Sequence, residues 1–253
     1  AVGLLGQINL PKEKLPAIVG PIFKKGSVSE QQRMLDVLGD LPVANSNTIL
    51  NSLIEKASKN QLDQGIILDL MESVKATENP KLIARLERLK KVGYSADSFQ
   101  ETLYGGNWWS GRSVFNNNPT AQCVRCHSVN GAGGEVGPAL DNIANVLSRE
   151  QLLEALIEPS LRLAPGYGSV NITLKDGQKV HGVLIDEDNT QLLLRTSEAE
   201  PLEIPLKRIA KRENSMSAMP AMGRMISRRE LRDLMEYLAT LKNQEIEIVG
   251  EGR

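Results

Sequence analysis

The chain is poor in cysteine and histidine, two residue types that often bind metals. Its 253 residues include two cysteines and two histidines. A zinc site of four thiolate or imidazole ligands would need all four of these residues. Because the histidines lie far apart, at positions 127 and 181, such a site is disfavoured. Thiol chemistry is therefore confined to one short segment, Cys123 to Cys126.

Long apolar runs and an excess of charge are also missing. No run approaches the roughly 18 apolar residues that suggest a membrane-spanning helix, so we expect a soluble chain that does not span a membrane. The 30 basic and 31 acidic residues give a net charge of −1. No overall field favours nucleic acid or an anionic membrane, so we expect no nucleic-acid partner. Since the chain begins at Ala1, a processed protein and a piece of a longer one both remain open.

The two cysteines belong to one motif, C-V-R-C-H, formed by Cys123, Cys126 and His127. Two thiols at this spacing can each add to a vinyl group of one haem, and the adjacent imidazole is placed to ligate the iron. The alternatives are half of a zinc site, a redox dithiol and a vicinal disulfide. A redox dithiol usually begins a helix after a strand, whereas FNNNPTAQ before Cys123 predicts a helix end and a turn. The motif therefore predicts covalent attachment of one haem c.

The segment after the motif is rich in glycine, from Gly131 through Gly137 to the sequence G-P-A-L. Glycine permits close backbone approach, so we expect a flexible loop beside a haem. The order of helix, CxxCH, glycine-rich loop, methionine loop and C-terminal helix resembles that of class I cytochromes c. This resemblance implies that the carbonyl of Pro138 accepts the Nδ1 proton of His127 and leaves Nε2 for iron.

The sixth iron ligand is expected downstream. The candidates are Met216, Met219, Met222, Met225 and His181. Met219 is favoured because the cytochromes that this chain resembles carry the axial thioether in a Met-Pro loop before the last helix. Pro220 also restricts Met219 to an extended backbone. Met222 and Met216 remain alternatives, and His181 is expected to be a surface or core residue of a strand.

Two helices are predicted to flank the haem segment, over 108–116 and about 227–242. Ser227 and Glu230 form a predicted capping box, and leucines recur at helical spacing after it. The resemblance to cytochrome c implies that the two helices cross at a glycine facing an aromatic residue. We expect Gly111, with Phe115, to pack against Tyr237 or Leu234.

A segment between the haem loop and the methionine loop alternates like strands. Four strands are predicted between 169 and 206, with turns at Asp176-Gly177 and Asp188-Asn189. They predict an antiparallel β-meander inserted into the cytochrome at about 167–210. It either covers a haem edge, docks a partner or has no direct role.

The first 95 residues carry no identifiable chemistry. Their apolar periodicity predicts helices near 14–24, 30–39, 48–57, 63–75 and 80–91. Helices of this length suggest HEAT-like repeats, with a plain helical bundle as the alternative. The predicted fold is therefore mainly α. The expected domains are a HEAT-like region at 1–95, a linker at 96–106, a cytochrome c domain at 107–245 and a tail at 246–253.

The arrangement resembles a haem-binding module at the C-terminus of predicted sugar dehydrogenases of planctomycete, verrucomicrobial and bacteroidete type. This resemblance implies an electron-transfer module that accepts electrons from a sugar or alcohol dehydrogenase and passes them to a cytochrome or oxidase. Such a module is no enzyme by itself, and its place is periplasmic or otherwise extracytoplasmic. The alternative is a haem enzyme or gas sensor with an open iron position.

Overall fold

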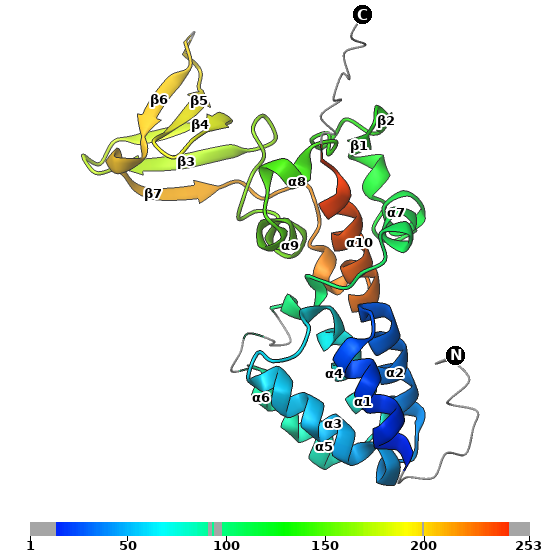
Figure 1. The fold of residues 1–253 in the computed structure, drawn as a ribbon. Helices are drawn as coiled ribbons and strands as arrows, with labels where there is room; N and C mark the ends of the chain where they lie inside the picture. The colour runs from blue at the N-terminus through cyan, green and yellow to red at the C-terminus, as the bar shows by residue number, and fades with distance from the viewer. Residues whose placement is uncertain (1–13, 91–92, 94–97, 199, 243–253) are drawn as a thin grey trace, which may run out of the picture. The chain divides into compact units, whose positions relative to one another are not determined.

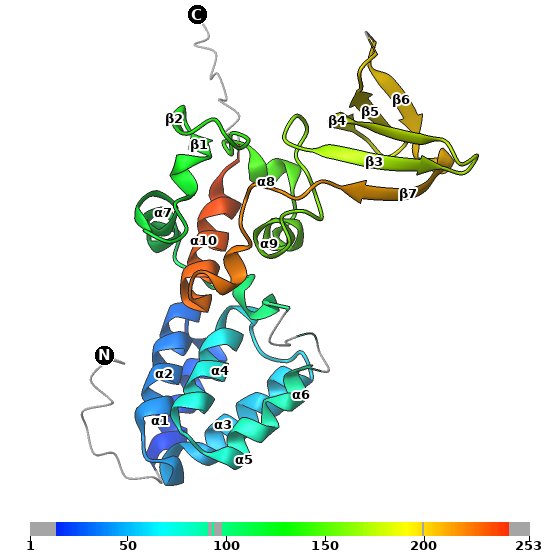
Figure 2. The same ribbon diagram turned by 180° about the vertical axis from the view of Figure 1, so that it is seen from behind.

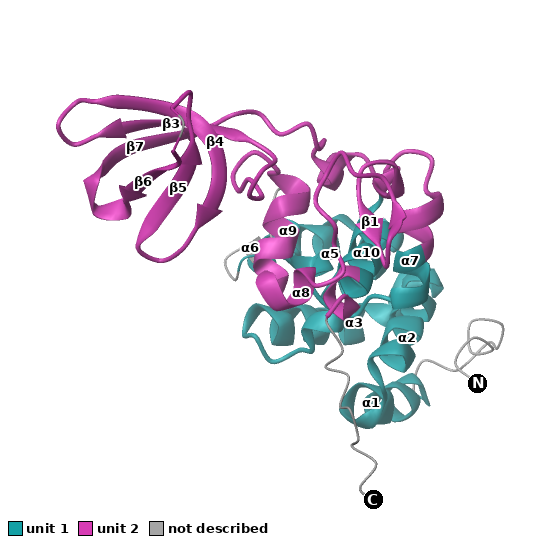
Figure 3. Ribbon diagram, turned by 90° about the horizontal axis from the view of Figure 1, so that it is seen from above, with its two compact units in different colours: residues 1–112, 227–237 teal, residues 113–226, 238–253 magenta. Residues whose placement is uncertain are grey.

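The computed structural model describes residues 14–90, 93, 98–198 and 200–242. The chain divides into two compact units (Figure 3). Unit 1 contains residues 1–112 and 227–237, and unit 2 contains residues 113–226 and 238–253. Among the described residues, no helix has the length and apolar character needed to cross a membrane.

Unit 1 is built from short helices, as the periodicity predicts. They are α1 (Leu15–Lys25), α2 (Val28–Asp40), α3 (Val43–Ser58), η3 (Gln64–Ile66), α4 (Ile67–Ala76), α5 (Pro80–Arg85), α6 (Glu87–Lys90) and η4 (Gln100–Thr102) (Figure 1). The one helix expected over 80–91 is interrupted at Leu86 and forms two. The helical prediction is confirmed, whereas a HEAT-like repeat stays a prediction.

Local signals explain where several of these helices begin. Ser27 and Glu30 form a capping box at the start of α2, in which the Glu30 N–H donates to Ser27 Oγ and the Ser27 N–H donates to Glu30 Oε2. At α5, Asn79 accepts hydrogen bonds from two backbone N–H groups and Pro80 occupies the first turn. The apolar faces of these helices then meet in one core, which includes Met34, Leu35, Leu38, Leu50, Ile54, Leu70, Leu82 and Leu89.

The helices α7 (Trp108–Asn117) and α10 (Arg228–Thr240) form where they were predicted. Ser227 and Glu230 make the predicted capping box at the start of α10. Within unit 1, a Cβ atom at Gly111 would lie 1.9 Å from the Asp233 carbonyl oxygen and 2.8 Å from Tyr237 Cβ. The predicted close approach of Gly111 to Tyr237 is therefore confirmed.

Charged side chains of α10 add contacts that the sequence did not indicate. Arg232 donates to the buried carboxylate of Asp69 at 2.6 Å. Arg228 pairs with the buried Glu101 and lies over the Phe99 ring. These ion pairs join α10 to α4 and η4, which explains why most of this C-terminal helix belongs to the same compact unit as the N-terminal helices.

Unit 2 contains the cysteine motif, two short helices and two sheets. Its elements are η5 (Cys123–Arg125), β1 (Ser128–Val129), β2 (Ala132–Gly133), α8 (Ile143–Val146), α9 (Arg149–Ile157), β3 (Ser169–Leu174), β4 (Lys179–Glu187), β5 (Gln191–Arg195), β6 (Leu202–Pro205), η6 (Leu206–Arg208), β7 (Ile209–Asn214) and η7 (Met222–Arg224). The N–H of Ala144 also donates to the carbonyl of Leu241, just beyond α10.

The inserted sheet has five strands, where four were predicted. Its order is β6-β5-β4-β3-β7, all antiparallel (Figures 1 and 2). The four predicted strands form the meander, and β7 returns to pair with β3. The insertion therefore extends past 210, to Asn214. The missed strand, I-A-K-R-E-N, lacks apolar alternation and is held by backbone hydrogen bonds.

Both predicted turns of the insertion are present. Gly177 has a φ of 88°, a value that favours glycine, and Asp176 accepts a hydrogen bond from the Gln178 N–H. Asp188 accepts hydrogen bonds from the backbone of Thr190 and Gln191. Alternate residues of the strands build a separate apolar core with Leu163, which precedes β3. The strand residues are Val170, Ile172, Leu174, Leu184, Leu192, Leu194 and Ile204.

Candidate functional site

The C-V-R-C-H motif forms one tight turn. The N–H groups of Cys126 and His127 both donate to the carbonyl of Cys123, at 3.1 and 2.9 Å. The preceding Asn118 accepts from two backbone N–H groups, which makes the turn expected after α7. Both thiols and the imidazole therefore come from five consecutive residues, and the local chain alone sets their spacing.

The two cysteines are free thiols in different surroundings. Cys123 is half-buried and Cys126 is exposed. Burial raises the pKa of the Cys123 thiol to about 11, and the neighbouring Cys126 adds to this rise, while a backbone hydrogen bond opposes it. A redox dithiol needs a thiol with a lowered pKa. The surroundings of Cys123 therefore disfavour that alternative.

A structural zinc site has no support in the described part of the chain. No three His, Cys, Asp or Glu side chains gather there as metal ligands. His181 lies exposed on β4, where its Nδ1 is 2.9 Å from Asn171 Oδ1. Its predicted position in a strand is confirmed, and it lies on the surface.

The imidazole of His127 is oriented by a backbone carbonyl. Its Nδ1 lies 2.8 Å from the Pro138 oxygen. Because a carbonyl oxygen can only accept, Nδ1 carries the proton, and in the neutral ring Nε2 keeps its lone pair. A ring held in this way can bind a metal ion through Nε2.

The glycine-rich segment begins as a short hairpin and continues as the predicted loop from Gly134 to Pro138. The pair β1 and β2 is joined by Asn130 and Gly131, both with positive φ. The N–H groups of Gly134 and Gly137 donate to the carbonyls of Val124 and Cys126. The segment is thus hydrogen-bonded directly to the cysteine turn.

Two of these glycines are required by close contact. A Cβ atom at Gly134 would lie 2.0 Å from the Arg125 oxygen, and one at Gly137 would lie 2.6 Å from His127 Cε1. The backbone therefore passes along the edge of the imidazole at a distance that a larger residue cannot reach. Free thiols on one turn, a lone pair on Nε2 and this glycine cradle fit a covalently attached haem.

The four candidate methionines differ in burial. Met216 is 91% exposed and Met225 is 41% exposed, whereas Met222 is 2% exposed. Met219 is half-buried, and its N–H donates to Ser217 Oγ at 3.1 Å. The fold brings Cys123, Cys126, His127 and Pro138 together and leaves Met219 on a separate segment, between β7 and η7.

Other residues that hold this segment were missed from the sequence. The Ser217 N–H donates to Ser160 Oγ, and the Asn214 amide donates to the carbonyls of Ser160 and Leu161. Ser217 lies two residues before Met219, and a serine that accepts from the backbone two residues on is a local turn signal. Ser160 is 57 residues from Ser217, and no local pattern connects them.

Comparison with known proteins agrees with the motif. A family model described as cytochrome c matches residues 110–193. The match covers the cysteine turn, the glycine hairpin and much of the inserted sheet, and it ends before the methionine segment. It supports a c-type cytochrome module in this chain, with covalently bound haem and an electron-transfer role. No curated protein matches the chain.

Proposed function

We propose that the chain carries one haem c, joined to Cys123 and Cys126, with His127 and Met219 as axial ligands of a six-coordinate iron. The observation that carries the proposal is the hydrogen bond from His127 Nδ1 to the Pro138 oxygen. This hydrogen bond leaves the Nε2 lone pair of His127 free to bind iron. His127 directly follows Cys126, the second of the two free thiols.

The haem supplies one-electron redox chemistry when bound, and the protein encloses and tunes it. Pro138 keeps the proton on Nδ1, so His127 has one tautomer available. Gly134 lets the loop backbone approach the cysteine turn at Arg125, and Gly137 lets it pass against the His127 ring, which restricts rotation of the ring. These residues thus hold the proximal ligand in a single orientation.

Burial supports Met219 as the sixth ligand. Met216 lies in solvent, and Met222 is packed away in the 3-10 turn η7 against α9. Met219 is half-buried, precedes Pro220 and lies in a segment with short anchors. A ligand needs a side chain that is neither free in solvent nor committed to the core, and Met219 fits this description best.

The four single Met→Ala variants test the ligand. We expect Met219→Ala to admit carbon monoxide to the ferrous protein and to remove the methionine-to-iron charge-transfer band. The same change at the exposed Met216 or Met225 leaves both features unchanged, whereas Met222→Ala keeps the iron six-coordinate but removes packing from the segment that bears Met219. Since a thioether favours ferrous iron, Met219→His is expected to lower the reduction potential.

Three results would contradict parts of the proposal. Rapid carbon monoxide binding by the unmodified protein would indicate an open iron site, as in a haem enzyme or sensor. If Met222→Ala loses the charge-transfer band and Met219→Ala keeps it, the ligand is Met222, three residues further along the chain. Haem that stays attached on a denaturing gel after Cys123→Ala and Cys126→Ala are combined would refute the attachment sites.

The setting of the protein belongs to the same proposal. Haem is joined to reduced thiols after export, so the holoprotein is expected in the periplasm or another extracytoplasmic compartment. Its donor is a sugar or alcohol dehydrogenase domain or partner, and its acceptor is a cytochrome or oxidase. Haem staining of cell fractions tests the location, and cytoplasmic holoprotein would contradict it.

A further inference from the structure

The segment that bears Met219 is tied to the rest of unit 2 through its own backbone. The Met219 N–H donates to Ser217 Oγ at 3.1 Å, and the Ser217 N–H donates to Ser160 Oγ at 3.0 Å. Ser160 lies three residues after the end of α9, the helix that precedes the inserted sheet. The approach to Met219 is therefore anchored two residues before the thioether.

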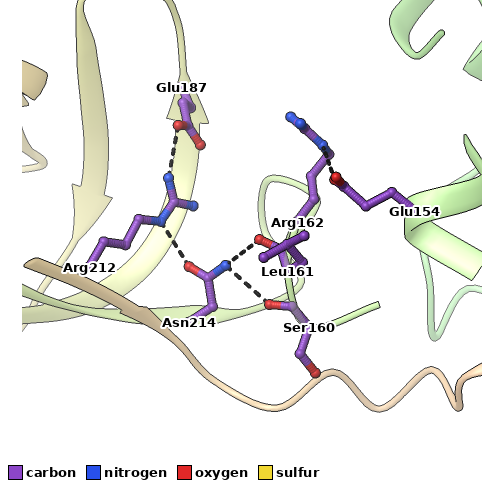
Figure 4. A pocket seen from close by; sticks show the side chains of 7 residues that line it. All are labelled: Glu154, Ser160, Leu161, Arg162, Glu187, Arg212 and Asn214. Atoms are coloured by element: carbon purple, nitrogen blue, oxygen red, sulfur yellow. Dashed lines mark hydrogen bonds and ion pairs between the residues drawn. The ribbon is translucent and has the colours of Figure 1, made fainter. Parts of the chain in front are cut away.

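A second anchor comes from the last strand of the insertion. Asn214, at the end of β7, donates through Nδ2 to the carbonyls of Ser160 and Leu161, at 3.1 and 2.8 Å. Its Oδ1 accepts from Arg212 Nε at 2.8 Å, and Arg212 also pairs with Glu187 on β4 (Figure 4). One amide thus connects two strands of the sheet to the segment after α9.

The far end of the methionine segment is held by packing. Met222 is buried in η7, which packs on α9, and Ile226 is buried just beyond it. Met219 lies two residues after Ser217 and three before Met222. Because each residue spans at most about 3.5 Å, these short connections leave the Met219 backbone little room to move.

We propose that Ser160 and Asn214 are positioning residues for Met219, and that the inserted sheet serves to hold the sixth ligand in place. This inference rests on the proposed function, in which Met219 ligates the iron. A thioether is a weak donor, so its occupancy depends on a backbone that presents it in one orientation. The insertion then has a role inside the cytochrome, since β7 carries one of the two anchors.

The anchors lie beside an open cleft of about 460 Å³, lined by Glu154, Ser160, Leu161, Arg162, Glu187, Arg212 and Asn214 (Figure 4). Water can therefore replace a lost partner, and the net contribution of each hydrogen bond is modest. A typical net value corresponds to a change of about fivefold in an equilibrium. We expect an effect of this size on release of the methionine from iron.

The test measures cyanide binding to the ferric holoprotein in Ser160→Ala and Asn214→Ala. Both are expected to bind cyanide about fivefold faster than the unmodified protein, because the methionine leaves the iron more often. Ser160→Thr keeps the acceptor hydroxyl and is expected to bind at the original rate. Asn171→Ala, on the neighbouring strand β3, removes an amide that contacts the exposed His181 and is the matched control.

The outcomes separate the two proposals. If Met219→Ala accelerates cyanide binding while Ser160→Ala and Asn214→Ala match Asn171→Ala, the ligand assignment stands and the positioning role is overturned. If Met219→Ala changes neither the rate nor the charge-transfer band, both proposals fail. A thermal unfolding curve shows whether each variant is folded at the assay temperature. If Asn214→Ala is not, Ser160→Ala and its rescue by Ser160→Thr decide the question.

Discussion

At the scale of single residues, a glycine contact controls the orientation of the imidazole. A Cβ atom at Gly137 would lie 2.6 Å from His127 Cε1, so Gly137→Ala forces the ring to tilt. We expect haem to remain attached while a high-spin ferric fraction appears in the electron paramagnetic resonance spectrum. Overpacking of this kind costs about 1–3 kcal/mol. The exposed neighbour gives the control Val136→Ala, and identical spectra for the two variants would contradict the prediction.

The thiol of Cys123 makes a separate prediction for haem-free protein. Its pKa of about 11 exceeds the value near 8.5 of an unfolded cysteine, so it stays protonated at neutral pH. In the variant Cys126→Ala, which keeps the burial of Cys123, alkylation of Cys123 at pH 8 is expected to be slower than in the unfolded chain. The rate should rise until pH passes about 11.

In the haem-free protein, where Cys123 keeps its thiol, the same shift affects stability at high pH. The unfolded thiol loses its proton near its ordinary pKa, whereas the folded thiol keeps it up to about pH 11. The folded state therefore binds more protons in this interval, and the free energy of unfolding falls as pH rises through it. The expected loss is on the order of 2 kcal/mol, measured by denaturant unfolding. A flat stability profile between pH 8.5 and about 11 would contradict it.

At the scale of elements, the crossing of α7 and α10 depends on one missing side chain. A Cβ atom at Gly111 would lie 1.9 Å from the Asp233 oxygen, which is a backbone atom and cannot yield easily. Gly111→Ala is expected to lower the free energy of unfolding by about 3 kcal/mol or more. Gly20→Ala, inside α1 with open space around its Cβ, is the matched control and should be stabilising by about 0.5–1 kcal/mol. Equal effects would show that helix propensity alone matters.

The inserted sheet contains one strand, β7, that its sequence pattern did not predict. Four strands alternate buried and more exposed positions and were predicted within a few residues of their ends. The strand β7 has one apolar residue that packs on the core, Ile209, and its other residues pair with β3 through the backbone. Backbone hydrogen bonds carry no side-chain pattern, so the sequence did not indicate this strand.

At the scale of the whole molecule, a buried ion pair ties α10 to the N-terminal helices. Asp69 is 1% exposed and Arg232 is 6% exposed. The distance from Arg232 Nη1 to Asp69 Oδ2 is 2.6 Å. Arg232→Met leaves the carboxylate buried with only the more distant Arg229, at 3.7 Å. We expect a loss of about 3–5 kcal/mol in the free energy of unfolding of the holoprotein, measured in guanidinium chloride.

Two variants control this prediction. Asp69→Leu combined with Arg232→Met removes both charges and is expected to recover most of the loss. Arg208→Met breaks the exposed pair with Asp176 and should cost no more than about 1 kcal/mol. If the double variant is as unstable as Arg232→Met, packing of the arginine stem rather than charge explains the effect.

The sequence by itself determined what is contiguous. Cys123, Cys126 and His127 lie in five residues, so the turn geometry follows from the local backbone. The capping box at Ser227, the hairpin turn at Gly177 and most helices of the first 90 residues are local in the same sense. Short-range hydrogen bonds and periodic burial depend on residues that are close in the sequence, so a single sequence is enough to predict them.

Only the tertiary structure decided which distant polar groups meet. The partners Ser160 and Ser217 are separated by 57 residues, and Asp69 and Arg232 by 163. Each of these residues is a common surface type whose pattern predicts exposure. The buried charge of Asp69 is tolerated because Arg232, on another helix, pairs with it. The segment at Ser217 is held because the Ser160 hydroxyl accepts a hydrogen bond from its backbone. Such pairings depend on how the chain packs, and no local pattern of the sequence encodes them.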